Sequence, residues 1–326
     1  MERHYIEFET PDHALIRSDV LGAPGDDEVL ISVHHAGINR ADLLQRLGLY
    51  PPPPDASPIP GLEVAGDIVA VGRNVSNWQP GDRVCALTHG GGYASLALAR
   101  GDHCLALPDT LATEVGAALP EALLTVWYNV FERAALTSGE TVFIQGGSSG
   151  IGSVGIQMAK AMGCSVLSSA GAEARCRQVE ALGADFVANH RESLSEQFSA
   201  AGYREKIDVV LDMAGGDAMQ TYLDLAAPDG RIACIGVMRG FQAEINLATI
   251  FMKRLTLTGS TLRRLGSSER AACFEKIREH IWPHVLSGAI APIVAQVYPL
   301  AEALSAHEHM SSGAHFGKLV LSCQPM

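Results

Sequence analysis

A glycine-rich run between a predicted strand and a predicted helix constrains this chain more than any other feature. Residues 145–160 read QGGSSGIGSVGIQMAK, in which Gly150, Gly152 and Gly155 match the pattern GxGxxG. The run follows the strand-like segment ETVFIQ and continues with helical spacing. Glycines here let the backbone approach a pyrophosphate, and the helix N-terminus offers free N–H donors. This context favours a dinucleotide site over a glycine-rich turn that binds nothing.

The residues around this run alternate between strand and helix patterns. Helices are expected at 151–163, where Gly163 would end the helix, at 172–183 and at 218–230. Six strands are expected, at 140–145, 165–170, 185–190, 206–216, 231–236 and 254–262. Such alternation predicts an α/β fold, namely a doubly wound Rossmann domain whose parallel sheet carries helices on both faces.

The two ends of the chain have a different texture. Short apolar runs at 29–36, 66–72, 83–87 and 92–99 predict antiparallel or barrel-like strands, and the prolines of 51–60 predict a rigid loop. Beyond residue 262, one amphipathic helix is expected at 268–288 and strands at 293–300 and 316–323. We therefore predict a Rossmann domain (121–262) inserted in a mainly β, partly barrel-like catalytic domain (1–120 and 263–326).

Composition narrows the classes of function. The net charge of −12 argues against nucleic acid or an anionic membrane as the main partner. No signal peptide and no apolar run of about 18 residues is recognised, so no membrane span is expected. Seven widely spaced cysteines indicate reduced thiols in a cytoplasmic protein and leave no cysteine-rich zinc site.

The end of the second predicted Rossmann strand bears on the choice of nucleotide. An NAD site usually has a carboxylate there for the ribose 2′-OH, whereas this strand ends in Ser-Ser-Ala-Gly, with Gly171 last. Arg175 and Arg177 follow closely. A missing carboxylate beside guanidinium groups favours NADPH, with NADH possible, although either arginine is equally explained as a solvated helix charge.

The segments AGINRAD (36–42) and GLEVAG (61–66) resemble two motifs of the medium-chain dehydrogenase/reductase superfamily. Zinc alcohol dehydrogenases of that superfamily have Cys and His where this chain has Asn39 and Leu62. Asn is a poor zinc ligand, Leu is none, and Glu63 alone cannot hold a catalytic zinc. The resemblance thus implies a metal-free member in which hydrogen bonding replaces Lewis acidity. The alternative for Asn39 is a loop residue that caps its own backbone.

Further segments from both ends and the middle resemble quinone oxidoreductases of the zeta-crystallin type, and most of all the tumour-suppressor-inducible subgroup. They include NRADLLQRLGLYPPP, PEALLTVWYNVF, ANHRE and GKLVL. The resemblance implies a GroES-like catalytic domain, NADPH-dependent quinone reduction and a homodimer paired through 254–262. Two alternatives stay open. One is NADPH-dependent reduction of an enone C=C bond, with Tyr50 as proton donor, and the other is a non-catalytic, crystallin-like NADPH-binding protein.

The resemblance also assigns roles to individual residues. It places Asn39 and Tyr50 beside the nicotinamide as catalytic residues. The remaining cofactor-binding residues that it implies are Thr125, Gly147, Ser148, Ser149, Gly150, Ile151, Gly152, Gly171, Arg175, His190, Gly236, Val237, Met238, Ser260, Thr261, Leu262 and Lys318. Ordinary packing is the alternative for Tyr50 and for the strand-end groups 236–238 and 260–262. A hydrogen bond back to the preceding turn of its helix is the alternative for Thr125. Surface exposure is the alternative for His190 and Lys318.

Overall fold

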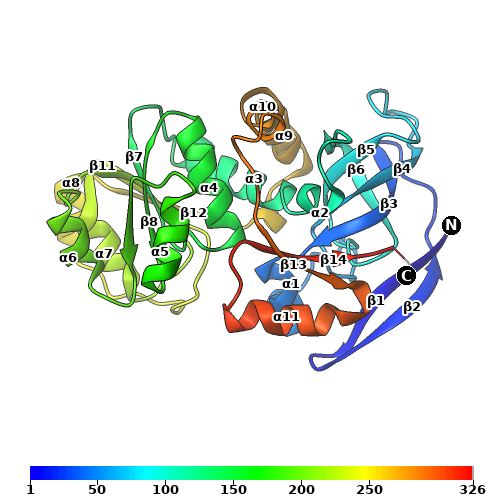
Figure 1. Ribbon diagram of the computed structural model, residues 1–326, viewed down its shortest axis with the longest axis horizontal. Coiled ribbons are helices and arrows are strands. Elements are labelled where there is room, and N and C mark those ends of the chain that lie inside the picture. Colours follow the sequence, from blue (N-terminus) through cyan, green and yellow to red (C-terminus); the bar gives the residue numbers. More distant parts are fainter. Residues whose placement is uncertain (325–326) are drawn as a thin grey trace. The chain divides into compact units, whose positions relative to one another are not determined.

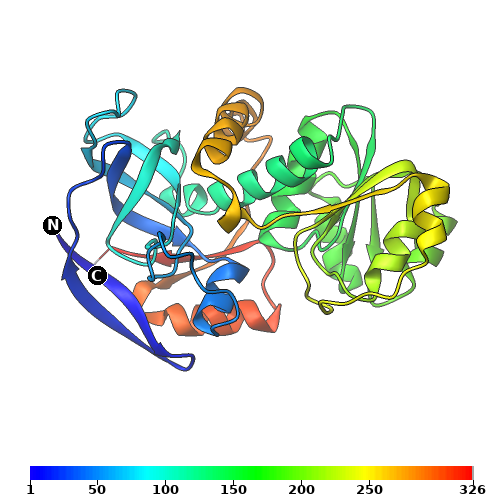
Figure 2. The same cartoon turned by 180° about the vertical axis from the view of Figure 1, so that it is seen from behind.

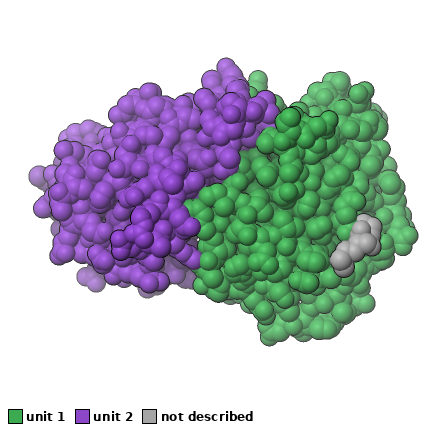
Figure 3. Space-filling model, in the orientation of Figure 1, with its two compact units in different colours: residues 1–122, 266–278, 292–326 green, residues 123–265, 279–291 purple. Residues whose placement is uncertain are grey.

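The computed structural model describes residues 1–324, which form two compact units (Figure 3). The first unit contains residues 1–122, 266–278 and 292–326, and the second contains residues 123–265 and 279–291. Both sequence-based domain boundaries fall close to a limit between the units, but residues 279–291 group with the second unit. Among the described residues, no helix is both long and apolar enough to cross a membrane.

The first unit is built on a mixed, six-stranded sheet that partly closes into a barrel. Its strand order is β13-β14-β3-β4-β5-β6, and β3 also pairs with β6, which closes four of the strands into a ring. The strands are β3 (Glu28–Gly37), β4 (Glu63–Val71), β5 (Arg83–Thr88), β6 (Leu96–Ala106), β13 (Val294–Pro299) and β14 (Lys318–Ser322). The helices are α1 (Arg40–Arg46), α2 (Thr113–Gly116), α9 (Ser267–His280), the 3-10 turn η3 (Leu300–Glu302) and α11 (Ala303–Ser312). This sheet confirms the barrel-like expectation.

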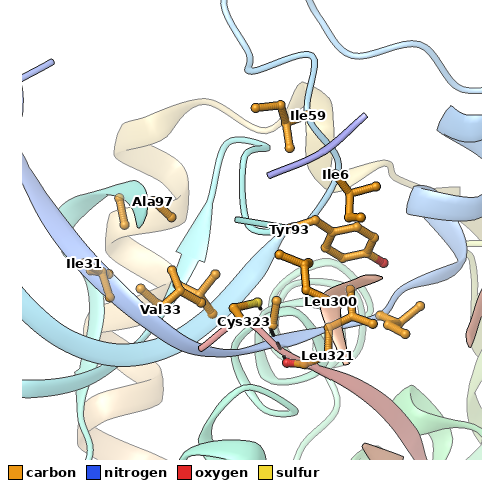
Figure 4. Packing of buried hydrophobic residues seen from close by; sticks show 14 of the residues in the cluster. Ile6, Ile31, Val33, Ile59, Tyr93, Ala97, Leu300, Leu321 and Cys323 are labelled. Carbon is orange, nitrogen blue, oxygen red and sulfur yellow. Dashed lines mark hydrogen bonds between the residues drawn. The ribbon is translucent and has the colours of Figure 1, made fainter. Parts of the chain in front are cut away.

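The core of the first unit fills the inside of this sheet. Inward-facing residues of β3, such as Ile31 and Val33, meet Leu321 and Cys323 near the C-terminus, and the Tyr93 ring lies among them (Figure 4). No residue of β3 is fully exposed, and most of the strand is buried, as expected of a strand at the centre of the sheet. Burial of this apolar surface fixes the places where β3 ends and where β4 and β14 begin, and these places carry the polar residues described below.

An N-terminal hairpin was not expected from the sequence. Strands β1 (Glu2–Thr10) and β2 (His13–Val20) pair antiparallel, and an isolated bridge joins Tyr5 to Ala94 (Figure 1). The segment is rich in charge because most of its side chains are exposed; Ile6 alone of its apolar residues is fully buried. The charged pair Arg3–Asp19 crosses the hairpin.

The second unit is a parallel, six-stranded sheet in the order β12-β11-β10-β7-β8-β9. Its strands are β7 (Thr141–Ile144), β8 (Ser165–Ala170), β9 (Phe186–Asn189), β10 (Ile207–Asp212), β11 (Ala226–Cys234) and β12 (Thr256–Gly259). The chain moves outward from β7 in both directions, so the strand order reverses between β7 and β10. This is the doubly wound topology that the alternation predicted, and in such folds ligands bind at the carboxyl ends of the strands beside the reversal, here β7 and β10.

Helices cover both faces of this sheet. Helices α4 (Gly150–Ala161) and α5 (Glu173–Glu180) pack on β7, β8 and β9 (Figure 1). Helices α6 (Leu194–Ala200), α7 (Ala218–Leu225) and α8 (Leu247–Lys253) pack against one another, and α8 faces the viewer in Figure 2. The helix α3 (Pro120–Val126) continues into a π-helical turn η1 (Trp127–Arg133), and α10 (Trp282–Leu286) completes the unit.

Several expected elements differ in extent. The helix expected at 218–230 ends at Leu225, because β11 begins at Ala226. The helix expected at 268–288 is divided into α9 and α10 just before Pro283, which cannot supply an N–H to a continuous helix. The strand expected at 92–99 starts only at Leu96 and runs to Ala106. Helices α8 and α11 and the helix that begins at Pro120 were not expected.

Candidate functional site

The glycine-rich run forms the turn from β7 into α4, as predicted. Ser149 is the N-cap of α4, and its hydroxyl accepts a hydrogen bond of 2.9 Å from the Gly152 N–H. The N–H of Gly147 donates to the Ser169 carbonyl at 2.9 Å. Within residues 1–324, the backbone N–H groups of Ser148, Gly150 and Ile151 donate to no other group. A helix N-terminus with unused donors is suited to an anionic group such as a pyrophosphate.

Two glycines of this turn leave no room for a side chain. A Cβ on Gly147 would lie 2.3 Å from the Ser168 hydroxyl oxygen, and a Cβ on Gly152 would lie 2.3 Å from the Gly146 carbonyl oxygen. Gly146 itself has φ +72°, which favours glycine. Ser168 and Ser169 are fully buried behind the turn and hold it from β8. The glycines therefore serve both the close packing of the turn and access to its N–H groups.

The residues that follow β10 and β11 lie beside the glycine turn. Met213 connects the two, because its Sδ is 3.9 Å from the Ser149 hydroxyl and its backbone crowds Gly236. A Cβ on Gly236 would lie 2.5 Å from the Met213 carbonyl oxygen. Val237 and Met238 follow with exposed fractions of 42% and 67%. Such apolar exposure on a strand-end loop fits a ligand-facing surface better than core packing.

A buried asparagine links two of the other predicted residues. The Ser260 hydroxyl lies 2.7 Å from Asn129 Oδ1, and Asn129 Nδ2 donates to the Thr125 carbonyl at 2.9 Å. Asn129 lies in the π-helical turn, a feature that is frequent at functional sites. The Thr125 side-chain hydroxyl bonds to no other described residue, so it does not bond back to its own helix. Thr261 is exposed, and Leu262 begins a 3-10 turn (Leu262–Arg264).

Several basic side chains lie around the end of β8. Gly171 lies against His190, because a Cβ on Gly171 would be 3.0 Å from the imidazole Nε2. Burial lowers the pKa of His190, and the nearby Arg191, Arg239 and Arg175 lower it further. Arg177 instead pairs with Glu173 at 2.7 Å, an exposed pair within α5. Of the two arginines considered from sequence, Arg175 is therefore the one close to His190.

In the first unit, Asn39, Glu63 and Lys318 form a buried triangle. Asn39 Nδ2 donates to Glu63 Oε1 at 2.9 Å, and Lys318 Nζ donates both to Asn39 Oδ1 at 2.6 Å and to Glu63 Oε1. Pairing of β14 with β3 brings Lys318 to this place, since the Ile38 N–H donates to the Leu319 carbonyl at 2.9 Å. Lys318 is only 3% exposed, so it is not a surface lysine.

The backbone of Asn39 is held separately from its side chain. Asp42, which is fully buried in α1, accepts from the Asn39 N–H at 2.9 Å and from the Gly61 N–H at 2.9 Å. Asn39 and Asp42 form a capping box at the start of α1, in which each side chain accepts from the backbone N–H of the other. Asn39 therefore caps α1 locally, as the alternative from sequence had it, and its amide also joins Glu63 to Lys318.

Tyr50 lies in the part of the first unit where Arg270 is buried. Arg270 is 5% exposed, and burial lowers its pKa while the charges of Glu121, Asp55 and Tyr50 oppose that shift. Its guanidinium lies 3.4 Å from His89 Nδ1, and His89 Nε2 lies 3.2 Å from Asp55. The proline loop thus contributes a polar group as well as Tyr50, and sequence reasoning named only Tyr50.

The described residues contain no cluster of three or more His, Cys, Asp or Glu side chains with metal-binding geometry. Beside Asn39, both carboxylate oxygens of Glu63 already accept hydrogen bonds. Oε1 accepts from Asn39 and Lys318, and Oε2 accepts from the Glu121 N–H at 2.9 Å. Leu62 offers no ligand atom.

Comparison with known proteins identifies the family of this chain. Residues 25–109 match the alcohol dehydrogenase GroES-like domain, and residues 150–279 match the zinc-binding dehydrogenase domain. The quinone oxidoreductase of Mus musculus is 34% identical over 322 residues, which cover 97% of this chain and 96% of the relative. The chain belongs to the quinone oxidoreductases of the medium-chain dehydrogenase/reductase family.

Solved structures of this family have the same fold. An Escherichia coli quinone oxidoreductase complexed with NADPH has a TM-score of 0.84 and 27% identity, covering 99% of this chain and 100% of its own. The CurK enoyl reductase has a TM-score of 0.86 and 25% identity, covering 98% of this chain and 99% of its own. The two-domain fold expected from sequence, a GroES-like sheet domain with a Rossmann domain, is thereby confirmed.

Proposed function

We propose that this member of the family is an NADPH-dependent quinone oxidoreductase that transfers hydride without a metal ion. The observation that carries the proposal is the turn before α4, whose unused N–H groups at Ser148, Gly150 and Ile151 suit a pyrophosphate. Identity to quinone oxidoreductases along nearly the whole chain supports the reaction type, and the NADPH-complexed relative supports the cofactor.

The donor set near Asn39 supports metal-free chemistry. A zinc ion needs several electron-pair donors, whereas this place holds the cation of Lys318, an amide and one carboxylate whose oxygens both accept hydrogen bonds. The Lys318 ammonium group already supplies the positive charge that would compensate Glu63. A second cation would face repulsion here, and no ligand atom is left for it.

The residues divide the work between binding and orientation. When bound, NADPH supplies a hydride to an electron-poor acceptor. In the second unit, the turn at Gly147–Gly152 would bind the pyrophosphate, while Thr125, Gly236, Val237, Met238 and the 260–262 segment would orient the nicotinamide. In the first unit, Asn39, Tyr50 and Lys318 would position the reacting end, and the polar groups of Asn39 and Lys318 are held by buried partners.

A preference for NADPH over NADH follows from the residues around β8. No carboxylate follows Ala170 at the strand end except Glu173, whose side chain is engaged with Arg177. His190 and Arg175 supply positive or proton-donating groups instead. A ribose 2′-phosphate carries charge that these groups would stabilise, whereas a 2′-OH gains less from them.

Reduction of an enone is the second candidate. The CurK enoyl reductase has the same fold at 25% identity, and Tyr50 offers a hydroxyl near a buried guanidinium. Reduction of a C=C bond needs a proton at carbon, which is slow without a positioned acid, whereas a quinone needs protons only on oxygen. Rapid turnover of an enone beside slow turnover of quinones would favour this candidate.

We also propose a cytoplasmic homodimer. Strand β12 is an edge strand of the Rossmann sheet. Exposed apolar side chains include Leu257 in β12 and Phe251 in α8. An apolar edge strand invites pairing with a second copy. All seven cysteines are free, which fits a reducing compartment. The charge of −12 agrees with a small-molecule acceptor rather than nucleic acid.

One experiment tests the reaction and the cofactor together. NADPH and NADH are titrated separately against the protein, and the loss of absorbance at 340 nm is then followed with a quinone and with an enone. We expect tighter binding of NADPH and faster turnover of the quinone. The proposal is wrong if no pyridine nucleotide binds, or if neither acceptor oxidises bound NADPH.

A further inference from the structure

Glu121 stands out in the first unit as a carboxyl group without a partner. It lies in the first turn of α3 and is half-buried. Its backbone N–H donates to Glu63 Oε2 at 2.9 Å, but its own side-chain carboxyl makes no hydrogen bond or ion pair with residues 1–324. The neighbouring acids Asp42 and Glu63 both accept hydrogen bonds, whereas the Glu121 carboxyl makes no such structural contact within the described residues.

Two carboxyl groups, those of Glu63 and Glu121, lie near one lysine, Lys318. Lys318 Nζ contacts Glu63, and Glu63 also accepts from Asn39 and from the Glu121 N–H. All three of these groups donate hydrogen bonds to the Glu63 carboxyl. The positive charge of Lys318 is thereby committed to Glu63. A negative charge on Glu121 would lie close to the Glu63 carboxyl, and it would have no ion pair among the described residues to compensate it. Two acids placed in this way do not both ionise readily.

The pKa of Glu121 agrees with this geometry. Burial raises it to about 8, and the charges of Glu63 and Asp42 act in the same direction, while Lys318 and Arg270 oppose them. These four groups come from β4, α1, β14 and α9, which are the elements that face Glu121. At neutral pH the carboxyl is therefore mainly protonated and able to donate a hydrogen bond or a proton.

One basic group near Glu121 suits the reduction of a carbonyl acceptor. Arg270 lies within electrostatic reach of both Glu121 and Tyr50, and it is buried. A guanidinium in a poorly hydrated place stabilises negative charge that develops on a carbonyl oxygen. A half-buried acid also retains access to solvent, from which it can be reprotonated after each turnover.

We propose that Glu121 is the proton donor of this enzyme. Hydride arrival on a quinone or enone leaves the electron pair on a carbonyl oxygen of the acceptor. The O–H bond of Glu121 then breaks, its proton forms a new O–H bond with that oxygen, and Glu121 becomes a carboxylate. Water returns the proton to Glu121, so atoms and charge balance over the cycle. Arg270 stabilises the oxygen anion.

This inference rests on the proposed reduction reaction. The pH dependence of kcat tests the role of Glu121 separately from the reaction itself. The wild-type protein, Glu121→Gln and Glu121→Asp are compared from pH 6 to 9.5 with saturating NADPH and saturating quinone. We expect the wild-type kcat to fall about tenfold per pH unit above roughly pH 8, as the donor loses its proton. Glu121→Gln should lose at least about tenfold in kcat at pH 7 and show no such fall, and Glu121→Asp should restore the fall.

Controls distinguish a donor from a structural residue. Glu114→Gln alters another first-turn acid of the first unit, in α2, and should keep the wild-type profile. A purely structural role would lower the melting temperature and the rate of Glu121→Gln equally at every pH while keeping the fall. That result, or an unchanged rate in Glu121→Gln, overturns the inference. Failure of the wild-type protein to reduce any quinone or enone overturns the proposed function itself.

Discussion

Lys318 Nζ lies 2.6 Å from Asn39 Oδ1, although 279 positions separate the two residues in sequence. The Asn39 amide accepts from Lys318 and donates to Glu63, so its orientation is fixed by two different partners. Neither Asp nor Leu could do both, because Asp has no N–H and Leu has no polar atom. The choice of Asn in this loop is thus explained by the pair that it joins.

Removal of the lysine charge should destabilise the first unit strongly. Lys318→Met keeps most of the volume but leaves the Glu63 carboxylate buried without its cation, which typically costs about 3–5 kcal/mol. Urea unfolding at pH 7.5 measures the change. Lys206→Met alters an exposed lysine and should shift stability by less than about 0.5 kcal/mol.

The double variant Lys318→Met with Glu63→Gln sharpens this test. Loss of both charges removes the uncompensated carboxylate, so part of the lost stability should return. If Lys318→Met unfolds at the same urea concentration as the wild-type protein, the ion pair does not support the fold.

A Cβ at Gly152 should damage the dinucleotide turn. The Gly146 carbonyl oxygen would lie 2.3 Å from the new atom, so the turn must shift and its free N–H groups must move. We expect Gly152→Ala to weaken NADPH binding by about tenfold or more, equivalent to about 1.4 kcal/mol. Gly155→Ala is the matched control, since its Cβ would meet only side-chain atoms, of Val126 at 3.2 Å and of Ile144 at 3.3 Å. Equal NADPH affinity in both variants would contradict this role of the turn.

The sequence predicted the features that repeat along the chain, and it failed where distant segments meet. Alternating strands and helices and the glycine run determine the sheet of the second unit, because each feature is local. The Lys318–Glu63 pair depends on β14 joining β3, which no local pattern encodes. Asn129 was missed for the same reason, since its importance comes from Ser260 across the unit.

Local sequence patterns also failed to predict two features of the fold. The N-terminal hairpin was missed because its strands are mostly exposed and carry charges in place of an apolar face. The division between α9 and α10 was visible as Pro283, but the amphipathic pattern continued on both sides of it.

His190 should contribute to the preference for NADPH. It lies against Gly171 at the end of β8, with Arg175, Arg191 and Arg239 near enough to lower its pKa. We expect His190→Ala to weaken NADPH binding severalfold and to leave NADH binding nearly unchanged, because only NADPH carries the 2′-phosphate. Fluorescence titration of each nucleotide measures this, with the exposed His13→Ala as control. Equal losses for both nucleotides would show that His190 has no role in selectivity.

The proposed dimer edge can be tested with one residue of β12. Leu257 is 40% exposed, and we expect Leu257→Glu to oppose strand pairing, because two copies would bring like charges together at the interface. Sedimentation analysis at micromolar concentration should then give a dimer for the wild-type protein and a monomer for the variant. Val297→Glu changes an equally exposed residue on β13 and should remain dimeric. A monomeric wild-type protein would contradict the proposal.

Acid should destabilise the protein before its carboxylates titrate. Burial lowers the pKa of His307 to about 3 and that of His103 to about 4, from an ordinary value of 6.5. Below pH 6.5 the unfolded chain therefore binds protons that the folded chain does not, so stability falls as pH decreases from 6.5 towards 4. Each histidine should cost about 1–2 kcal/mol between pH 6.5 and 5. The raised pKa of Glu121 acts oppositely over this range, but it is one group against two.

Variants isolate the contribution of His307 to this pH dependence. His307→Gln keeps a polar partner for the Tyr93 hydroxyl, which lies 3.0 Å from the imidazole, but it does not titrate. The free energy of unfolding in urea should therefore decrease less between pH 6.5 and 5 for this variant than for the wild-type protein. His13→Gln alters an exposed histidine and should keep the full decrease. An identical decrease in wild type and His307→Gln would mean that the buried imidazole accepts a proton without unfolding, which would contradict its burial beside Phe8 and Tyr93.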